Sequence, residues 1–220
     1  MVSAIVFIPL FTALFLLTIN EDKEEFARRT ALGASVLTFI ISLGLLTGFD
    51  SETAEFQFVE RYAWISDFGI EYYVGVDGIS LFLVLLTTLL SPLVILSTWG
   101  SVERRVREYL FFFLILETGM IGTFVAVDVF LFYVFWEVML IPMYFLIGVW
   151  GGARRIYAAL KFLLYTMFGS LLMLVAILYL AYLHNTQYGV SSFDLLRLYT
   201  LDIPVNAQMW LFAAFALSFA

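Results

Sequence analysis

Long apolar runs separated by short polar segments set the hydropathy pattern of this chain. A helix needs roughly 20 apolar residues to cross the hydrocarbon core of a bilayer. The seventh run is still apolar at the last residue, so we expect the sequence to be the N-terminal part of a longer chain. The pattern predicts an all-α polytopic membrane protein with six complete spans and the start of a seventh, at residues 2–19, 30–48, 79–99, 110–127, 129–150, 157–183 and 208–220.

The segment between the second and third spans differs from the other connections. Residues 50–77 hold seven acids and only one arginine. Aromatic and polar residues alternate around Phe58, residues 70–74 are rich in β-branched and aromatic side chains, and residues 66–69 have the composition of a turn. We therefore predict a short β-hairpin on the outer surface. Farther along, residues 191–196 predict a short amphipathic helix at the membrane interface.

The composition agrees with a membrane location and excludes several kinds of site. The 220 residues are 63% hydrophobic and 13% charged, whereas soluble domains are about 45–50% apolar and about 25% charged. The absence of cysteine from the sequence excludes disulfides, thiolate metal sites and cysteine-ligated iron–sulfur clusters. With His184 as the single histidine, a histidine pair on haem is excluded within these residues. We expect one membrane domain over residues 1–220, with no metal or cofactor of its own.

Lysine and arginine are distributed unevenly between alternate loops. The loops after the first, third and fifth spans carry eight of them, whereas the loops after the second, fourth and sixth spans carry only Arg61 and Arg197. Because basic loops stay on the cytoplasmic side, the N-terminus is predicted to lie outside. The first apolar run has no basic segment before it and no small-residue cleavage site after it, so we interpret it as a retained span.

Three ionisable side chains lie inside predicted spans, where burying a charge costs a few kcal/mol. Glu137 is eight residues from the outer start of its helix, hence about 12 Å deep. It shares a helical face with Tyr133 and Tyr144. The functional interpretation is a proton or cation pathway, and the alternative is a protonated structural carboxyl bonded to a neighbour.

Glu117 and Lys161 lie about 10 Å and about 6–8 Å from the inner ends of their helices. They would meet if those helices pack together. Tyr157, Lys161 and Tyr165 form a polar stripe at i, i+4 and i+8. The alternative for Lys161 is snorkelling to the lipid headgroups, and the alternative for Glu117 is a buried structural carboxyl. The candidate proton-relay residues are therefore Glu137, Lys161 and Glu117.

Three long motifs make the sequence similar to a known family. They read Y-x-V-G-V-D-G-I-S-L-F-x-V-x-L-T-T at residues 72–88, F-W-E-V-M-L-I-P-M-Y-F-L-I-G-V-W-G-G at 135–152 and A-A-L-K-F-L-L-Y-T-x-x-G-S at 158–170. The chain resembles antiporter-like chain M of respiratory complex I, which is chain 4 in mitochondrial counting. The resemblance implies the first half of a fourteen-helix inverted-repeat fold. The related chains L and N and the multisubunit sodium/proton antiporters share this architecture.

The resemblance also implies a function and its residues. It points to a proton-translocating subunit of an NADH:quinone oxidoreductase in the inner membrane of a bacterium. Glu137 would be the functional carboxylate, paired with a seventh-helix lysine after Phe219, and Glu117 and Lys161 would belong to the same polar axis. NAD, FMN, iron–sulfur clusters and quinone are expected in other subunits, with chains L and N and membrane lipid as partners and no nucleic acid. The alternative is a subunit of a multisubunit sodium/proton antiporter.

Overall fold

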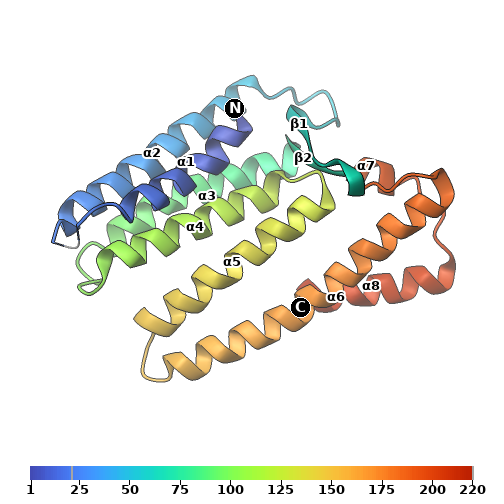
Figure 1. Cartoon of the computed structure of the whole chain (residues 1–220). Coiled ribbons are helices and arrows are strands. Elements are labelled where there is room, and N and C mark those ends of the chain that lie inside the picture. Colours follow the sequence, from blue (N-terminus) through green and yellow to red (C-terminus); the bar gives the residue numbers. More distant parts are fainter. Residues whose placement is uncertain (21, 220) are drawn as a thin grey trace.

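The computed structural model describes residues 1–20 and 22–219, which form a bundle of helices with one small sheet (Figure 1). Consecutive long helices run in opposite directions. In chain order the elements are α1 Val2–Leu16, α2 Glu24–Gly48, β1 Gln57–Ile65, the 3-10 turn η1 Ser66–Phe68, β2 Ile70–Val76, α3 Gly78–Ser97, α4 Val106–Val125, α5 Val129–Trp150, α6 Arg155–Tyr188, α7 Leu195–Leu198 and α8 Val205–Phe219.

Within the described residues, five helices are long and apolar enough to cross a bilayer, namely α2 to α6. The prediction of a first span over 2–19 differs from the structure, because α1 has only 15 residues. After Leu16 the amides of residues 17–19 donate to carbonyls three residues earlier, so the apolar run ends in tight turns. The helix α8, also 15 residues long, starts directly after Pro204, three residues before the predicted start at 208.

The helix α6 is longer than its hydropathy predicts. It has 34 residues, a length of about 51 Å at 1.5 Å per residue, against about 30 Å for the hydrocarbon core. It passes the predicted end at residue 183 and stops at Gly189, whose φ of 76° is left-handed. Glycine adopts this conformation readily. One turn earlier, the buried His184 ring places Nδ1 2.7 Å from the Val190 carbonyl oxygen, which fastens the chain reversal.

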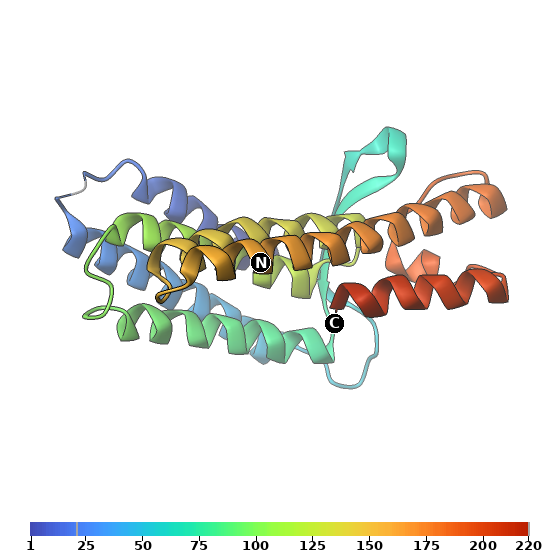
Figure 2. The same ribbon diagram turned by 90° about the horizontal axis from the view of Figure 1, so that it is seen from below.

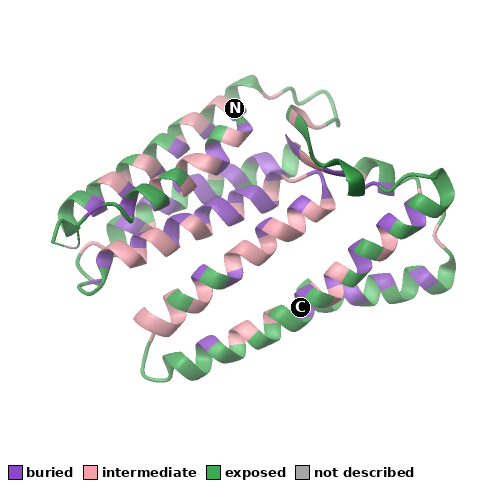
Figure 3. Ribbon diagram, viewed as in Figure 1, coloured by how far each residue is buried: buried purple, intermediate pink, exposed green. Residues whose placement is uncertain are grey.

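The helix α4 lies at the centre of the bundle, in contact with α1, α2, α3 and α5. The most buried segments are on these central helices, while α6 and α8 are largely exposed (Figure 3). A Cβ added at Gly119 would lie 2.5 Å from Met139, and one at Gly122 would lie 2.3 Å from Phe135. Small residues let membrane helices approach closely, and these two glycines allow α5 to pack closely against α4. The helix α5 packs in turn on α6, and α6 packs on α8.

The strands β1 and β2 pair antiparallel as a hairpin that projects from one end of the bundle (Figure 2). Between them Gly69 has φ 70°, and a Cβ there would lie 2.2 Å from the Ser191 carbonyl oxygen. The sheet contacts the chain beyond α4, because the Val127 amide donates to the Tyr73 carbonyl at 2.9 Å. These contacts hold the hairpin against the segment after α4 and the segment after α6.

The bundle has two chemically different ends. The hairpin end carries the sheet, the α4–α5 connection and the segment between α6 and α8. The basic end carries the α1–α2, α3–α4 and α5–α6 connections. At the hairpin end, Asp128 and Asp194 pair in an isolated antiparallel β-bridge, which joins the start of α5 to the segment after α6.

Candidate functional site

Glu137 lies on α5, on a face directed toward α6. The residue is half-buried, and its Oε1 atom is buried without a hydrogen-bond partner among the described residues. One turn earlier, the Tyr133 hydroxyl interacts with Glu137 and with Ser170 of α6. The three side chains form a small polar group within an otherwise apolar contact between the two helices. This group consists of one carboxyl and two hydroxyls in contact across the two helices.

The end of α8 reaches the same region. The Phe219 ring packs edge-on against Trp136, with 5.1 Å between ring centroids. On α6, a Cβ added at Gly169 would lie 3.2 Å from the Cα of Ser218, so the backbones of α6 and α8 nearly touch there. Three helices therefore converge beside the Tyr133–Glu137 pair.

Glu117 lies in a different environment. It is fully buried, and its Oε2 accepts a hydrogen bond from the Ser35 hydroxyl of α2 at 3.0 Å. Ser91 of α3 makes a further polar contact with this carboxyl, while Oε1 has no hydrogen-bond partner among the described residues. The glycines that admit α5, including Gly119, are on another part of the α4 surface. Glu117 is thus held between α2 and α3.

Buried hydroxyls line the contact between α2 and α3 beside Glu117, and the sequence reasoning did not single out those of α2. Ser35, Thr38 and Ser42 recur along one buried face of α2. Ser42 bonds Thr88 of α3 at 2.8 Å, and Thr88 also donates to a carbonyl one turn earlier, as Ser91 does. The spacing i, i+3, i+7 of hydroxyl residues in an apolar helix is the signal that would have found this row.

Lys161 is exposed on α6, between Tyr157 and Tyr165, which are 64% and 65% exposed. In the described part of the chain it forms an ion pair with neither Glu117 nor Glu137. The helix α5 lies between α4 and α6 (Figure 1), so the expected meeting of Glu117 and Lys161 does not occur. The three sequence-predicted residues occupy three separate environments.

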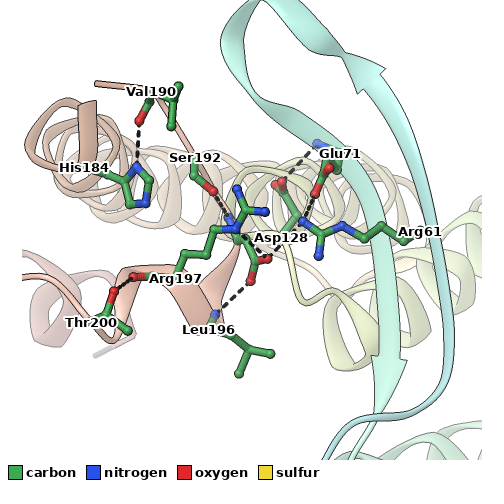
Figure 4. Close-up of polar contacts among 10 residues, drawn as sticks. Arg61, Glu71, Asp128, His184, Val190, Ser192, Leu196, Arg197 and Thr200 are labelled. Atoms are coloured by element: carbon green, nitrogen blue, oxygen red, sulfur yellow. Dashed lines mark hydrogen bonds and ion pairs between the residues drawn. The ribbon is translucent and has the colours of Figure 1, made fainter. Parts of the chain in front are cut away.

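The hairpin end contains a charged cluster that the sequence reasoning missed (Figure 4). The Arg61 guanidinium pairs with Glu71 and, at 3.0 Å, with the buried Asp194. Arg197 lies 3.6 Å from the same Asp194 carboxylate. The available signal was Arg61 itself, the single cation among the seven acids of residues 50–77.

Asp128 organises the same end through backbone amides. One oxygen accepts from the amides of Phe130 and Leu131, each at 2.9 Å, and caps α5. The other oxygen accepts from the Glu71 amide of β2 at 3.1 Å. Burial raises the pKa of the Asp128 carboxyl above its ordinary value, and these three amides oppose that rise. One side chain therefore holds both the helix start and the hairpin.

The helices and the site together define a class of protein. Several apolar helices of spanning length enclose acidic side chains within the bundle. In the residues that the structure describes, no group of three or more His, Asp or Glu is placed to hold a metal ion. The chain is a polytopic helical membrane protein with carboxyl groups buried between its helices.

Comparison with known proteins assigns the family. The family described as "NADH-ubiquinone oxidoreductase chain 4, amino terminus" matches residues 4–123, and "NADH:quinone oxidoreductase/Mrp antiporter, TM" matches residues 126–220. The chain belongs to the NADH-ubiquinone oxidoreductase chain 4 family, which confirms the resemblance carried by the three motifs.

Relatives of known name agree with that assignment. NADH-quinone oxidoreductase subunit M is 42% identical over all of this chain and 45% of its own length in Rickettsia conorii, and 47% identical over all of this chain and 44% of its own in Rhodobacter capsulatus. Chain 4 of Arabidopsis thaliana is 44% identical over 99% of this chain and 43% of its own length. The chain therefore spans less than half the length of these relatives.

Solved structures share the fold. A chain of respiratory complex I from Thermus thermophilus superposes on all of this chain and 43% of itself, with a TM-score of 0.83 and 28% identity. A chain of the Mrp complex from Dietzia sp. covers 99% of this chain and 22% of itself, with a TM-score of 0.76 and 18% identity, which indicates the fold alone.

Proposed function

We propose that this chain is the N-terminal part of a proton-translocating membrane subunit of an NADH:quinone oxidoreductase. The observation that carries the proposal is Glu137, whose carboxyl faces α6 beside Tyr133 and Ser170 and has one oxygen with no hydrogen-bond partner among the described residues. A carboxyl with an uncommitted oxygen can accept and release a proton while its helix stays in place. Family membership supplies the context in which such an exchange is useful.

The other candidates take distinct roles in this proposal. Glu117, with Ser35 on α2, forms a second proton-holding site in the α2–α3–α4 part of the bundle. Lys161 is exposed and forms an ion pair with neither Glu117 nor Glu137 among the described residues, and it would act on a group from the remainder of the protein. We expect the redox cofactors and quinone to bind in other subunits, and antiporter-like chains L and N to be neighbours.

The orientation of the chain follows from its two ends. We assign the basic end to the cytoplasmic side of a bacterial inner membrane, which places the N-terminus and the hairpin outside. The two arginines of the hairpin end are the exceptions to the basic-loop pattern. Both contact the Asp194 carboxylate, so they add little uncompensated positive charge on the outer side.

Replacement of Glu137 by glutamine tests the proposal in the intact complex that contains the full-length chain. Glutamine keeps the size of the side chain but cannot exchange a proton at this position. We expect Glu137→Gln to abolish proton pumping coupled to NADH oxidation in reconstituted vesicles, with assembly unchanged. Glu55→Gln, at an exposed acid before the hairpin, is the matched control. Pumping equal to wild type in the Glu137 variant would rule the proposal out.

A sodium/proton antiporter subunit is the second candidate, because the family model that matches residues 126–220 is described by both the NADH:quinone oxidoreductase and the Mrp antiporter. The two functions separate in one measurement. Transport that requires sodium and continues without quinone-linked turnover would favour the antiporter. A purely structural role for the buried charges predicts full activity when Glu137 and Lys161 are neutralised together.

A further inference from the structure

We propose that the basic end carries a binding site for the phosphate group of an anionic phospholipid. The site is a cavity of about 480 Å³ between the α3–α4 connection and the α5–α6 turn. It is separate from Glu137 and Glu117 and does not depend on the proton pathway. The wall of the cavity includes Glu103, Arg104, Arg105, Val149, Trp150 and Arg155.

Three arginines from two segments far apart in the sequence line this cavity. Arg155 donates to the Val149 carbonyl at 2.7 Å, and Arg105 lies 3.4 Å from Glu108. Among the described residues, Arg104 has no ion pair. A guanidinium has five N–H donors, so most of the donors at the cavity remain available. Their planar fork matches the oxygens of a phosphate.

The two segments are held in place around the cavity. The Trp150 indole donates to the Arg104 carbonyl at 2.9 Å and packs edge-on against Tyr109, with 5.3 Å between centroids. Arg105 has φ 54°, a left-handed conformation that is costly for a residue with a Cβ and persists only where the surroundings impose it. The contact from Trp150 thus fixes the loop that presents Arg104 and Arg105.

Two helix N-termini add to the positive character of the site. The helices α4 and α6 both begin at the basic end, and their N-cap residues, Arg105 and Arg154, form no side-chain cap hydrogen bond. The first amides of such helices lack intrahelical acceptors and lie at the positive end of the helix dipole. An anion near both starts would satisfy donors that the chain itself leaves open.

The surroundings favour a lipid as the source of the phosphate. The cavity lies at the ends of spanning helices, and Val149 and Trp150 give it an apolar side. Tryptophan is enriched at the level of the headgroups, and basic pockets between membrane helices on the cytoplasmic side bind anionic headgroups. Glu103 is the one acid on the wall and Glu108 pairs with Arg105, so three arginines against two acids leave a net positive site.

Photo-crosslinking tests the site in the intact complex with the full-length chain. The probe is a phosphatidylglycerol with a photoreactive group near its headgroup, titrated into delipidated complex, and crosslinks to residues 101–105 and 149–155 are quantified by mass spectrometry. Each arginine near a headgroup changes affinity by about fivefold. We therefore expect the double variant Arg104→Gln/Arg155→Gln to raise the half-saturating lipid concentration by roughly 25-fold.

Two further variants sharpen the result. Arg29→Gln, at an exposed arginine of the same end that pairs with Glu25, should leave crosslinking unchanged. Glu103→Gln removes the opposing charge and should lower the half-saturating concentration. Equal crosslinking in the double variant and in Arg29→Gln would overturn the proposal. Displacement of the probe by inorganic phosphate would also overturn it, because the site would then serve a free anion.

Discussion

Glu117 and Glu137 show how far the sequence reaches at the scale of single residues. Hydropathy placed both carboxyls inside helices, and the structure finds one buried and the other half-buried. Hydropathy does not show which helix each carboxyl faces, because α4 carries small or apolar residues on several sides. Gly119 and Gly122 turn one side of α4 toward α5, which leaves Glu117 for α2 and α3. That choice depends on packing between segments far apart in the sequence.

The glycine contacts give a prediction for stability. A Cβ at Gly122 would lie 2.3 Å from Cδ1 and 2.4 Å from Cγ of the Phe135 ring. Because Cγ lies on the axis about which the ring turns, rotation of the ring does not relieve the contact. We expect Gly122→Ala to destabilise the protein by about 1–3 kcal/mol through overpacking. The measurement is the thermal unfolding midpoint of the purified protein in detergent.

Gly33 is the matched control for that variant. It lies in the interior of α2 and is exposed, and apart from its own stretch of helix none of the described atoms lies within 4 Å of the position that an added Cβ would take. Because alanine is favoured over glycine within a helix, Gly33→Ala should leave the midpoint unchanged or raise it. A Gly122→Ala midpoint at or above that of Gly33→Ala would show that α4 and α5 approach less closely than described.

At the scale of elements, local chemistry marks some boundaries better than hydropathy does. The turn composition of residues 66–69 coincides with η1 and Gly69, and Asp77 caps α3 through Ser80 in a capping box. The ends of α1 and α6 differ from the predicted span ends, because an apolar count ignores backbone geometry. The helix α6 runs on through polar residues until Gly189 can take a left-handed conformation.

Asp128 allows the helix cap and the hairpin contact to be separated. Asparagine retains an oxygen for the amides of Phe130 and Leu131 but presents an N–H group to the Glu71 amide, donor against donor. We expect Asp128→Asn to speed hydrogen exchange at the Glu71 amide while residues 130 and 131 stay protected. Asp128→Ala should expose all three, with about 1 kcal/mol lost at the cap.

Site-resolved hydrogen exchange of the membrane protein provides the measurement. Protection of Glu71 in Asp128→Asn at the wild-type level would mean that the hairpin is held by other contacts. The neighbouring pairs of Arg61 with Glu71 and Asp194 are the candidates for that role.

At the scale of the whole molecule, the sequence predicted a multi-span membrane protein and its family, but not the order of packing. The central position of α4 and the separation of Glu117 from Lys161 by α5 required the structure. Apolar residues surround most of these helices, so hydropathy alone does not distinguish a face toward lipid from a face toward another helix.

The cysteine-free sequence makes the proposed orientation directly measurable. Thr53 lies in the exposed segment before β1 at the hairpin end, and Ser101 is exposed at the basic end. In intact cells a membrane-impermeant maleimide should label Thr53→Cys, and it should label Ser101→Cys only after permeabilisation. The full-length chain without other cysteines is the control, and the reverse pattern of labelling would invert the assigned orientation.

The β-bridge between Asp128 and Asp194 has a mechanical consequence. The tight turn after Trp150 ties α5 to α6 at the basic end, and the bridge ties the start of α5 to the chain beyond α6 at the other. A helix pair fastened at both extremities behaves as a closed frame that resists sliding of one member along the other. Rearrangement around the Glu137 carboxyl is then confined to rotation of side chains or to tilting of the frame as a unit.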